Sequence, residues 1–243
     1  MSLQVNEIFS GIQGEGYFIG EQSIFVRLSG CNLNCEWCDT KYAQQEEGKE
    51  WDVHELAVEI VEIGSEKGID SVVITGGEPL LQSKGLKELF EILSNRLKIT
   101  IETHGAYPIP EDLIKDKKYS IFFSISPKLS NSGTKYDKKM LDRNMKSLSE
   151  MGFYNYQLKF VIDTNNIKED VDETMHLMSE IILPEYLTIV YQPKADSGDT
   201  TMNLINKTKK LTDYFIKESY SVVYDIRILP QLHTLLYGNE RGY

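Results

Sequence analysis

The sequence predicts an α/β fold in which a parallel sheet is covered by helices. Short runs rich in β-branched and aromatic residues alternate with segments of helical periodicity, which is the pattern of repeated β–α units. Several runs, such as Val72-Val73-Ile74, are apolar throughout, as expected for strands covered on both faces. The length of 243 residues, with no evident linker or internal repeat, suits a single domain over residues 1–243.

The order of these runs gives the expected elements. We expect strands at residues 22–28, 71–75, 98–102, 120–126, 156–162, 186–192 and 221–228. Helical periodicity predicts helices at residues 52–67, 84–93, 135–151, 167–182 and 202–217. In the first of these helices apolar residues recur every three or four positions from Val53 to Ile63, and Asp52 supplies an acceptor to the first unpaired amides. Pro108 and Pro110 shorten the crossover that follows the third strand.

Polar segments punctuated by glycine and proline follow the predicted strands. They are Ser29-Gly30 with the cysteines beyond it, Gly76-Gly77-Glu78-Pro79, Thr103-His104-Gly105, Pro127-Lys128 and Pro193-Lys194. The carboxyl ends of parallel strands meet at one edge, and α/β proteins build their active sites there. The sequence therefore predicts an active site at that edge.

The only three cysteines of the chain lie within eight residues, as Cys31, Cys35 and Cys38. Iron–sulfur clusters normally take four thiolates. Three thiolates in a C-x3-C-x2-C spacing indicate a cubane with one iron left open for another ligand. The cluster is the interpretation we favour over three alternatives. Disulfides do not suit an odd count of cysteines without a signal peptide, a closed zinc site would have to recruit a histidine such as His54, and the cysteines would otherwise be buried bystanders.

Composition narrows the class of partner. The formal net charge is −11, and no basic stripe stands out, so we expect no nucleic acid as a direct partner. No apolar run reaches the length of a membrane span, and no targeting segment is visible at the amino terminus, so we expect no membrane association and a cytoplasmic location. A small-molecule substrate is the expectation that remains.

The turn Gly76-Gly77-Glu78-Pro79 follows a predicted strand and stands after the cysteine loop. Paired glycines let a ligand approach the backbone closely, and Glu78 offers a carboxylate suited to an ammonium group. A three-cysteine loop followed by such a turn resembles the radical S-adenosylmethionine (radical SAM) superfamily. The resemblance implies a 4Fe–4S cluster whose open iron binds S-adenosylmethionine and cleaves it to a 5′-deoxyadenosyl radical. It also implies a partial (β/α)6 barrel, here with short N- and C-terminal extensions.

Further motifs narrow the resemblance to one family. Residues 10–16 read Ser-Gly-Ile-Gln-Gly-Glu-Gly, Asp39-Thr40 follows the last cysteine, residues 124–128 read Ser-Ile-Ser-Pro-Lys, and residues 229–233 read Leu-Pro-Gln-Leu-His. Together with Arg27 and Thr75 these resemble the 7-carboxy-7-deazaguanine synthases. That family implies a lyase in queuosine and deazapurine biosynthesis that contracts 6-carboxy-5,6,7,8-tetrahydropterin to 7-carboxy-7-deazaguanine and ammonia. It also implies Mg2+, a homodimer, and an electron donor such as a flavodoxin or ferredoxin.

The family's functional residues transfer position by position. Substrate contacts fall on Ile12, Gln13, Gly14, Glu15, Arg27, Thr75, His233 and Tyr243. Contacts with S-adenosylmethionine fall on Gly77, Glu78, Glu102, Ser126, Pro127, Lys128 and Gln192. Cys31, Cys35 and Cys38 bind the iron, and Thr40 binds Mg2+. Among the substrate residues, Glu15 would pair with the guanidine-like edge of the pterin, Arg27 would clamp its carboxylate, and the terminal carboxylate of Tyr243 would read the pterin.

Some residues depart from this pattern or allow another interpretation. His104 stands where the family pattern has Asn or Gln, and no role transfers to it. Arg27 also suits a surface ion pair, Thr40 a turn hydroxyl and His233 a buried core histidine. Two other functions stay open from the sequence. They are a glycyl-radical-activating enzyme, which shares the cysteine loop but acts on a protein, and a zinc-stabilised binding module.

Overall fold

In the computed structural model, residues 1–44, 48–93, 96–115, 120–218 and 224–238 are described. Within them one nine-stranded sheet has the order β3-β1-β2-β4-β5-β6-β7-β8-β9. From β2 to β9 all neighbours are parallel, whereas β1 pairs antiparallel with both β2 and β3. The strands are β1 (Ser2–Ile12), β2 (Gln22–Leu28), β3 (Lys49–Asp52), β4 (Ser71–Gly76), β5 (Lys98–Thr103), β6 (Ile121–Ile125), β7 (Tyr156–Ile162), β8 (Thr188–Pro193) and β9 (Asp225–Ile228).

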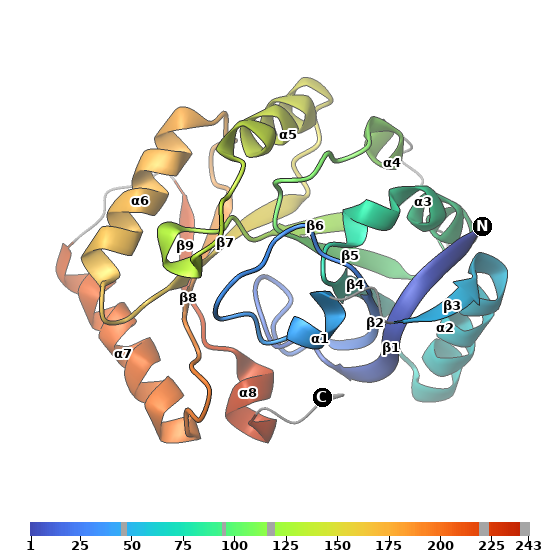
Figure 1. Ribbon diagram of the computed structural model, residues 1–243, viewed down its shortest axis with the longest axis horizontal. Helices are drawn as coiled ribbons and strands as arrows, with labels where there is room; N and C mark the ends of the chain where they lie inside the picture. Colours follow the sequence, from blue (N-terminus) through green and yellow to red (C-terminus); the bar gives the residue numbers. More distant parts are fainter. Residues whose placement is uncertain (45–47, 94–95, 116–119, 219–223, 239–243) are drawn as a thin grey trace.

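The sheet curves into an arc that does not close, and the longer helices lie along its outer side (Figure 1). The expected partial barrel is therefore confirmed. The helices are α1 (Lys41–Gln44), α2 (Val53–Lys67), α3 (Ser83–Leu93), α4 (Glu111–Lys115), α5 (Lys138–Glu150), α6 (Ile167–Glu180), α7 (Thr201–Glu218) and α8 (Leu232–Tyr237), with short 3-10 helices η1 (Pro79–Gln82) and η2 (Ser130–Ser132). None of the helices in the described ranges is long and apolar enough to cross a bilayer.

The pleat of each inner strand separates the hydrophobic core from the concave face. In β7, Leu158, Phe160 and Ile162 belong to the core beneath the helices. The alternate residues Lys159 and Val161 line the cavity on the other face. Because successive side chains point to opposite faces, one strand builds both the core and the site.

Most predicted elements are confirmed, and the differences have local reasons. Asp52 caps α2 as expected, since its carboxylate accepts hydrogen bonds from the amides of His54 at 2.8 Å and Glu55 at 3.4 Å. Strand β8 begins at Thr188 rather than at the predicted residue 186, because Tyr186 has a φ of 62° that a strand does not accommodate. Strands β1 and β3 and helices α1, α4 and α8 were not predicted. Strand β9 begins at Asp225, and residues 221–223 of the predicted strand lie outside the described residues.

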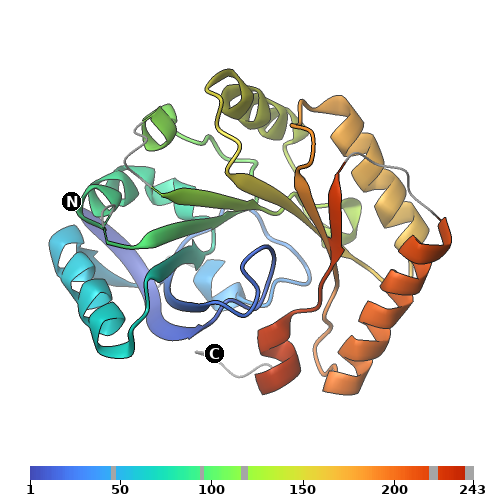
Figure 2. The ribbon, with the colours of Figure 1, turned by 180° about the vertical axis from the view of Figure 1, so that it is seen from behind.

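The turn between β1 and β2, residues 13–21, enters the arc and lies across its open middle (Figure 2). Tyr17 and Phe18 pack against Phe122 of β6, and the guanidinium of Arg227 on β9 lies 4.8 Å from the centre of the Tyr17 ring. The Tyr17 amide also donates to Gln157 Oε1 on β7 at 2.8 Å. Phe122 and Gln157 sit near the amino ends of their strands, so the hairpin forms a floor beneath the site.

Candidate active site

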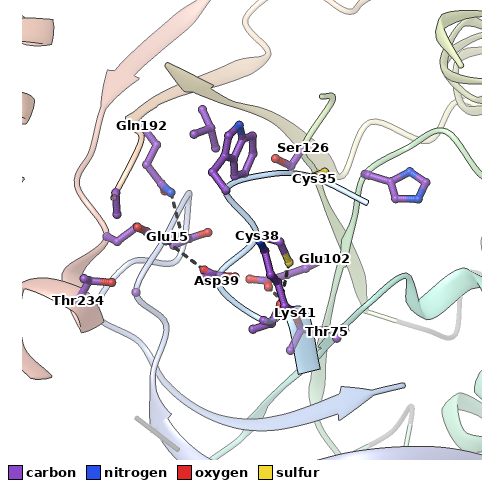
Figure 3. Close-up of a pocket in the computed structure, with 18 of the residues that line it drawn as sticks. Glu15, Cys35, Cys38, Asp39, Lys41, Thr75, Glu102, Ser126, Gln192 and Thr234 are labelled. Carbon is purple, nitrogen blue, oxygen red and sulfur yellow. Dashed lines mark hydrogen bonds between the residues drawn. The ribbon is translucent and has the colours of Figure 1, made fainter. Parts of the chain in front are cut away.

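A cavity of about 870 Å³ occupies the concave side of the arc, at the carboxyl ends of the strands. This volume lies at the upper end of the range for small-molecule sites, roughly 300–1,000 Å³. Figure 3 shows Glu15, Cys35, Cys38, Thr75, Glu102, Ser126 and Gln192 around it. The predicted residues that line it are Ile12, Gln13, Gly14, Glu15, Arg27, Cys31, Cys35, Cys38, Thr40, Thr75, Gly77, Glu102, Ser126, Lys128, Gln192 and His233.

The three cysteines carry free thiols and line this one cavity. Burial raises the pKa of Cys31 to about 11, and the neighbouring Cys35 and Cys38 add to the rise. Burial also raises the pKa of Cys35, while the nearby Lys128 ammonium opposes the rise. Without metal, Cys31 and Cys35 therefore favour the neutral thiol. Iron supplies the positive charge that stabilises thiolates, so cluster binding must displace these protons.

The Gly76 and Gly77 turn joins strand β4 to the start of the cysteine loop. The Gly77 amide donates to Leu28 O at 3.0 Å, and the Glu78 amide donates to Gly30 O at 2.8 Å. A Cβ at Gly77 would overlap the Gly30 carbonyl, and Gly76 has a φ of 135°. Both positions therefore require glycine, because the two backbones touch here.

The Glu78 carboxylate is buried inside the fold and is not among the residues that line the cavity, so its contact with the ammonium group of S-adenosylmethionine stays a prediction. Its side chain is fully buried and accepts hydrogen bonds from the amides of Leu80 (3.1 Å) and His104 (3.0 Å) and from the Thr103 hydroxyl (2.8 Å). Burial raises the pKa of Glu78 to about 7, although these hydrogen bonds favour the carboxylate. These hydrogen bonds fix the turn that follows β4. Pro127 also lies outside the cavity wall.

His104 connects this buried carboxylate to the cysteine loop. Its Nε2 lies 2.9 Å from Asn32 Oδ1 and 3.1 Å from Glu78 Oε2, while Nδ1 accepts a hydrogen bond from the Ala106 amide at 2.9 Å. Burial lowers the pKa of His104 to about 3, so the imidazole is neutral, and the Ala106 bond places its proton on Nε2. His104 thus ties the strand β5 end to the cluster loop through Asn32.

We expect His104→Phe to loosen the cysteine loop, because it removes both ring nitrogens while keeping an aromatic ring. The lost hydrogen bonds predict a fall of about 1–3 kcal/mol in the free energy of unfolding and a lower iron content per chain. Denaturant unfolding and iron analysis measure the two effects. His54→Phe is the control, since that histidine is 71% exposed on α2. Equal iron retention in both variants would contradict the proposed link between His104 and the cysteine loop.

Glu102 links residues predicted to bind the substrate with those predicted to bind the cofactor. Its Oε1 accepts from Gln13 Nε2 at 3.0 Å, and its Oε2 accepts from the Thr75 hydroxyl at 2.8 Å. Gln13 Oε1 in turn accepts from the Glu15 amide at 3.0 Å. On the cluster side, Lys128 Nζ lies 3.3 Å from Ser126 Oγ and 5.2 Å from the centre of the Trp37 ring.

The Glu15 carboxylate is held by three side chains from distant parts of the chain. Oε2 accepts from Lys159, and Oε1 accepts from Gln192 Nε2 at 3.0 Å and Gln231 Nε2 at 2.6 Å (Figure 3 shows the Gln192 contact). Burial would raise the pKa of Glu15, but the Lys159 ammonium overcomes it and holds the pKa at about 2. Lys159 was not among the predicted site residues.

Arg27 also lines the cavity, near the end of β2. Its Nε donates to Glu7 Oε1 at 2.6 Å, and the Tyr42 hydroxyl donates to the same oxygen at 2.7 Å. This bond engages Nε rather than the two terminal amino groups, which can also bind a carboxylate in parallel. Thr40 lies next to the cysteines, with its hydroxyl 3.6 Å from Cys38 Sγ.

The end of the described chain completes the cavity wall. The Leu232 amide donates to Gly14 O at 2.8 Å, and the His233 ring packs so closely on Gly14 that a Cβ there would overlap it. His233 therefore faces the hairpin, and its contact with the substrate stays a prediction. Tyr243 lies outside the described residues.

The profile of the Radical SAM superfamily matches residues 25–178. The chain is 31% identical to the 7-carboxy-7-deazaguanine synthase of Pyrobaculum aerophilum over 99% of its own length and 97% of the relative's. It is 32% identical to the enzyme of Clostridium acetobutylicum over the full length of both chains. The chain belongs to the 7-carboxy-7-deazaguanine synthase family of the radical SAM superfamily.

Two solved structures share the fold of this chain. QueE from Escherichia coli covers 96% of this chain and 95% of its own, with a TM-score of 0.65 and 23% identity. SuiB of Streptococcus suis bound to S-adenosylmethionine covers 85% of this chain with a TM-score of 0.58 and 18% identity. These two likenesses concern the fold alone.

Family membership decides among the alternatives that the cysteines left open. Radical SAM proteins bind a 4Fe–4S cluster and S-adenosylmethionine, and the residues present fit both, since three free thiols line a cavity that residues of strands β4 to β8 also line. His54, which a zinc site would have recruited, lies instead on α2 beside Glu88. In the described part of the chain no three His, Cys, Asp or Glu side chains form a group for a single metal ion.

Proposed function

We propose that this chain converts 6-carboxy-5,6,7,8-tetrahydropterin to 7-carboxy-7-deazaguanine and ammonia, as a radical SAM lyase of deazapurine biosynthesis. The relationship to 7-carboxy-7-deazaguanine synthases over nearly the whole chain is the observation that carries this function. The bound cluster and S-adenosylmethionine supply the 5′-deoxyadenosyl radical that starts the ring contraction. The enzyme also uses Mg2+, and we propose Thr40 as its protein ligand.

Different residues of the chain would bind the substrate and shield it from water. Arg27 and Glu15 both line one cavity, so a single pterin can offer its carboxylate to one and its pyrimidine edge to the other. The hairpin floor excludes water from below, which matters because a carbon radical must be kept from side reactions. Gln13, Thr75 and Glu102 form a hydrogen-bonded wall between the two predicted binding regions.

The direct test is turnover. Anaerobically reconstituted and reduced protein is incubated with S-adenosylmethionine, Mg2+ and 6-carboxy-5,6,7,8-tetrahydropterin, and the product is identified by mass spectrometry. A deazapurine with the mass of 7-carboxy-7-deazaguanine is the expected result. Protein that holds its cluster and cleaves S-adenosylmethionine without forming a deazapurine would contradict the proposed substrate.

We expect Arg27→Ala to keep the cluster and weaken use of the carboxylated pterin. Loss of charge-assisted hydrogen bonds to a carboxylate predicts a rise in KM of about 10- to 100-fold. Iron content and steady-state kinetics measure the two properties separately. Arg143→Ala, on the exposed side of α5, is the control. Unchanged kinetics in Arg27→Ala would rule out the carboxylate clamp.

The enzyme needs a reductant for its cluster, and we propose a flavodoxin or ferredoxin as the donor. We also propose a homodimer working in the cytoplasm, where cysteine thiols stay reduced. Sedimentation analysis of the purified protein tests the dimer, and reconstitution of turnover with each reductant tests the donor.

A further inference from the structure

We propose that Lys159 and Gln192, which flank Glu15, select the 2-amino-4-oxo edge of the pterin, so that Gln192 serves the substrate rather than S-adenosylmethionine. The inference rests on the proposed function and adds two specificity-determining residues to it. It starts from the arrangement of donors and acceptors around one carboxylate.

The three side chains come from different elements and meet in the cavity. Glu15 stands on the hairpin between β1 and β2, Lys159 on the inner face of β7, and Gln192 on the inner face of β8. Lys159 is 9% exposed and Gln192 is 2% exposed. Buried polar groups at these levels of exposure require partners, either from the protein or from a ligand.

The hydrogen bonds fix an order along the carboxylate. Lys159 binds Oε2, whereas Gln192 and Gln231 both donate to Oε1. An ionised carboxylate has about four acceptor sites, and the protein occupies three of them. The site that remains is on Oε2, beside the Lys159 ammonium.

Gln192 supplies a second acceptor. Its Oε1 is one of two buried side-chain polar atoms without a hydrogen-bond partner among the described residues, the other being the Tyr156 hydroxyl. Since Gln192 Nε2 is fixed on Glu15, the amide carbonyl is held beside the carboxylate. A ligand N–H at this position would satisfy it.

Lys159 supplies the donor. An ammonium has three N–H groups, and the contact with Glu15 uses one of them. Its pKa is raised because the charges of Glu15, Glu102 and Asp39 outweigh the opposing effect of burial, so Lys159 stays charged. The site therefore presents, in order, a donor on Lys159, an acceptor on Glu15 and an acceptor on Gln192.

A 2-amino-4-oxopyrimidine edge offers the complementary series. It presents the O4 carbonyl as acceptor, then the N3–H donor, then the exocyclic amino group as donor. Lys159 would face O4, Glu15 would face N3–H, and Gln192 would face the amino group. A 4-amino analogue reverses the donor and acceptor roles at the first two positions. It puts N–H donors against Lys159 and an unprotonated N3 acceptor against Glu15. Polar sites reject such mismatches because buried groups are left unpaired.

Equilibrium binding tests the assignment without turnover. The probes are 6-carboxypterin and 2,4-diaminopteridine-6-carboxylate, which share the carboxylate that Arg27 would bind and differ at positions 3 and 4. Each is titrated by its fluorescence into anaerobic holoenzyme saturated with S-adenosylmethionine. For the wild type we expect 6-carboxypterin to bind at least about tenfold more tightly than 2,4-diaminopteridine-6-carboxylate.

Two substitutions separate the roles. Lys159→Met should weaken 6-carboxypterin binding and bring the ratio of the two affinities close to one. Gln192→Leu should weaken both pteridines by about tenfold, because both carry the 2-amino group, and leave the Kd of S-adenosylmethionine unchanged. Lys194→Met is the matched control, since Lys194 also lines the cavity but pairs with Asp163 at 2.7 Å, and it should keep the wild-type ratio.

The outcomes that overturn the inference differ from those that overturn the function. Lys159→Met with an unchanged ratio would remove Lys159 from recognition, and Gln192→Leu that weakens only S-adenosylmethionine would return Gln192 to the cofactor. If Lys159→Met does not fold with its cluster, the Gln192→Leu titration decides alone. Wild-type holoenzyme that binds S-adenosylmethionine but neither pteridine would instead defeat the proposed function.

Discussion

Cys35→Ala is expected to lose the iron–sulfur cluster and all turnover. Cys35 is the most buried of the three cysteines, at 6% exposed, and it occupies the middle of the loop. Only two thiolates would remain for the cluster, which already has three instead of the usual four. The sequence contains no other cysteine that could replace the lost one. Iron and sulfide analysis, visible absorption and product formation after anaerobic reconstitution measure the loss.

Asn34→Ala is the matched control for this variant, because Asn34 lies in the same loop with an exposed side chain. It should retain the brown colour and the iron content of the wild type. A Cys35→Ala protein that still held a full complement of iron and made product would show that Cys35 is not a cluster ligand. That result would remove the basis of the radical chemistry.

Gly77→Ala should cause a large loss of stability and of cluster loading. The new methyl group would overlap the Gly30 carbonyl, so the turn after β4 would have to move away from the start of the cysteine loop. This movement would break the 2.8 Å hydrogen bond from the Glu78 amide to Gly30 O. Since backbone atoms cannot rotate out of the way as a side chain does, we expect the free energy of unfolding to fall by about 3 kcal/mol or more.

Denaturant unfolding of the metal-free protein gives the stability, and iron analysis after reconstitution gives the loading. Gly68→Ala is the comparison, because Gly68 has a φ of 68° with no atom within 4 Å of the added carbon. Alanine at this position should lower the free energy of unfolding by only about 1–2 kcal/mol, because it must adopt a left-handed backbone conformation. A Gly77→Ala protein no less stable than Gly68→Ala would mean that the two loops do not touch as described.

The fold could be predicted from the sequence wherever a strand is rich in β-branched and aromatic residues. Strands β2 and β7 begin and end at the predicted residues. Strand β1 was missed because its residues alternate only in part and most are half-buried, so its period is weak. Short elements such as α1 and α8 carry too few residues for a periodic pattern, and tertiary contacts decide whether they form.

The residues of the site were predicted less completely than the strands, and the reason is physical. Lys159 was missed although Gln157 and Lys159 alternate with apolar residues in β7, because a lysine in a strand usually indicates a solvent-exposed face. Only the curvature of the sheet around Glu15 makes that face interior. The direction of the Glu78 side chain depends in the same way on Thr103 and His104, which the chain brings from a different strand.

The hairpin floor and the contact between Gly14 and Leu232 connect the two halves of the chain around one cavity. The cysteine loop is synthesised early, but the wall that Gln231 and His233 provide is added only after almost all other elements. A growing polypeptide on the ribosome can therefore expose its cluster ligands long before it has a closed chamber. Enclosure of the cavity thus depends on residues that are made well after the cysteine loop.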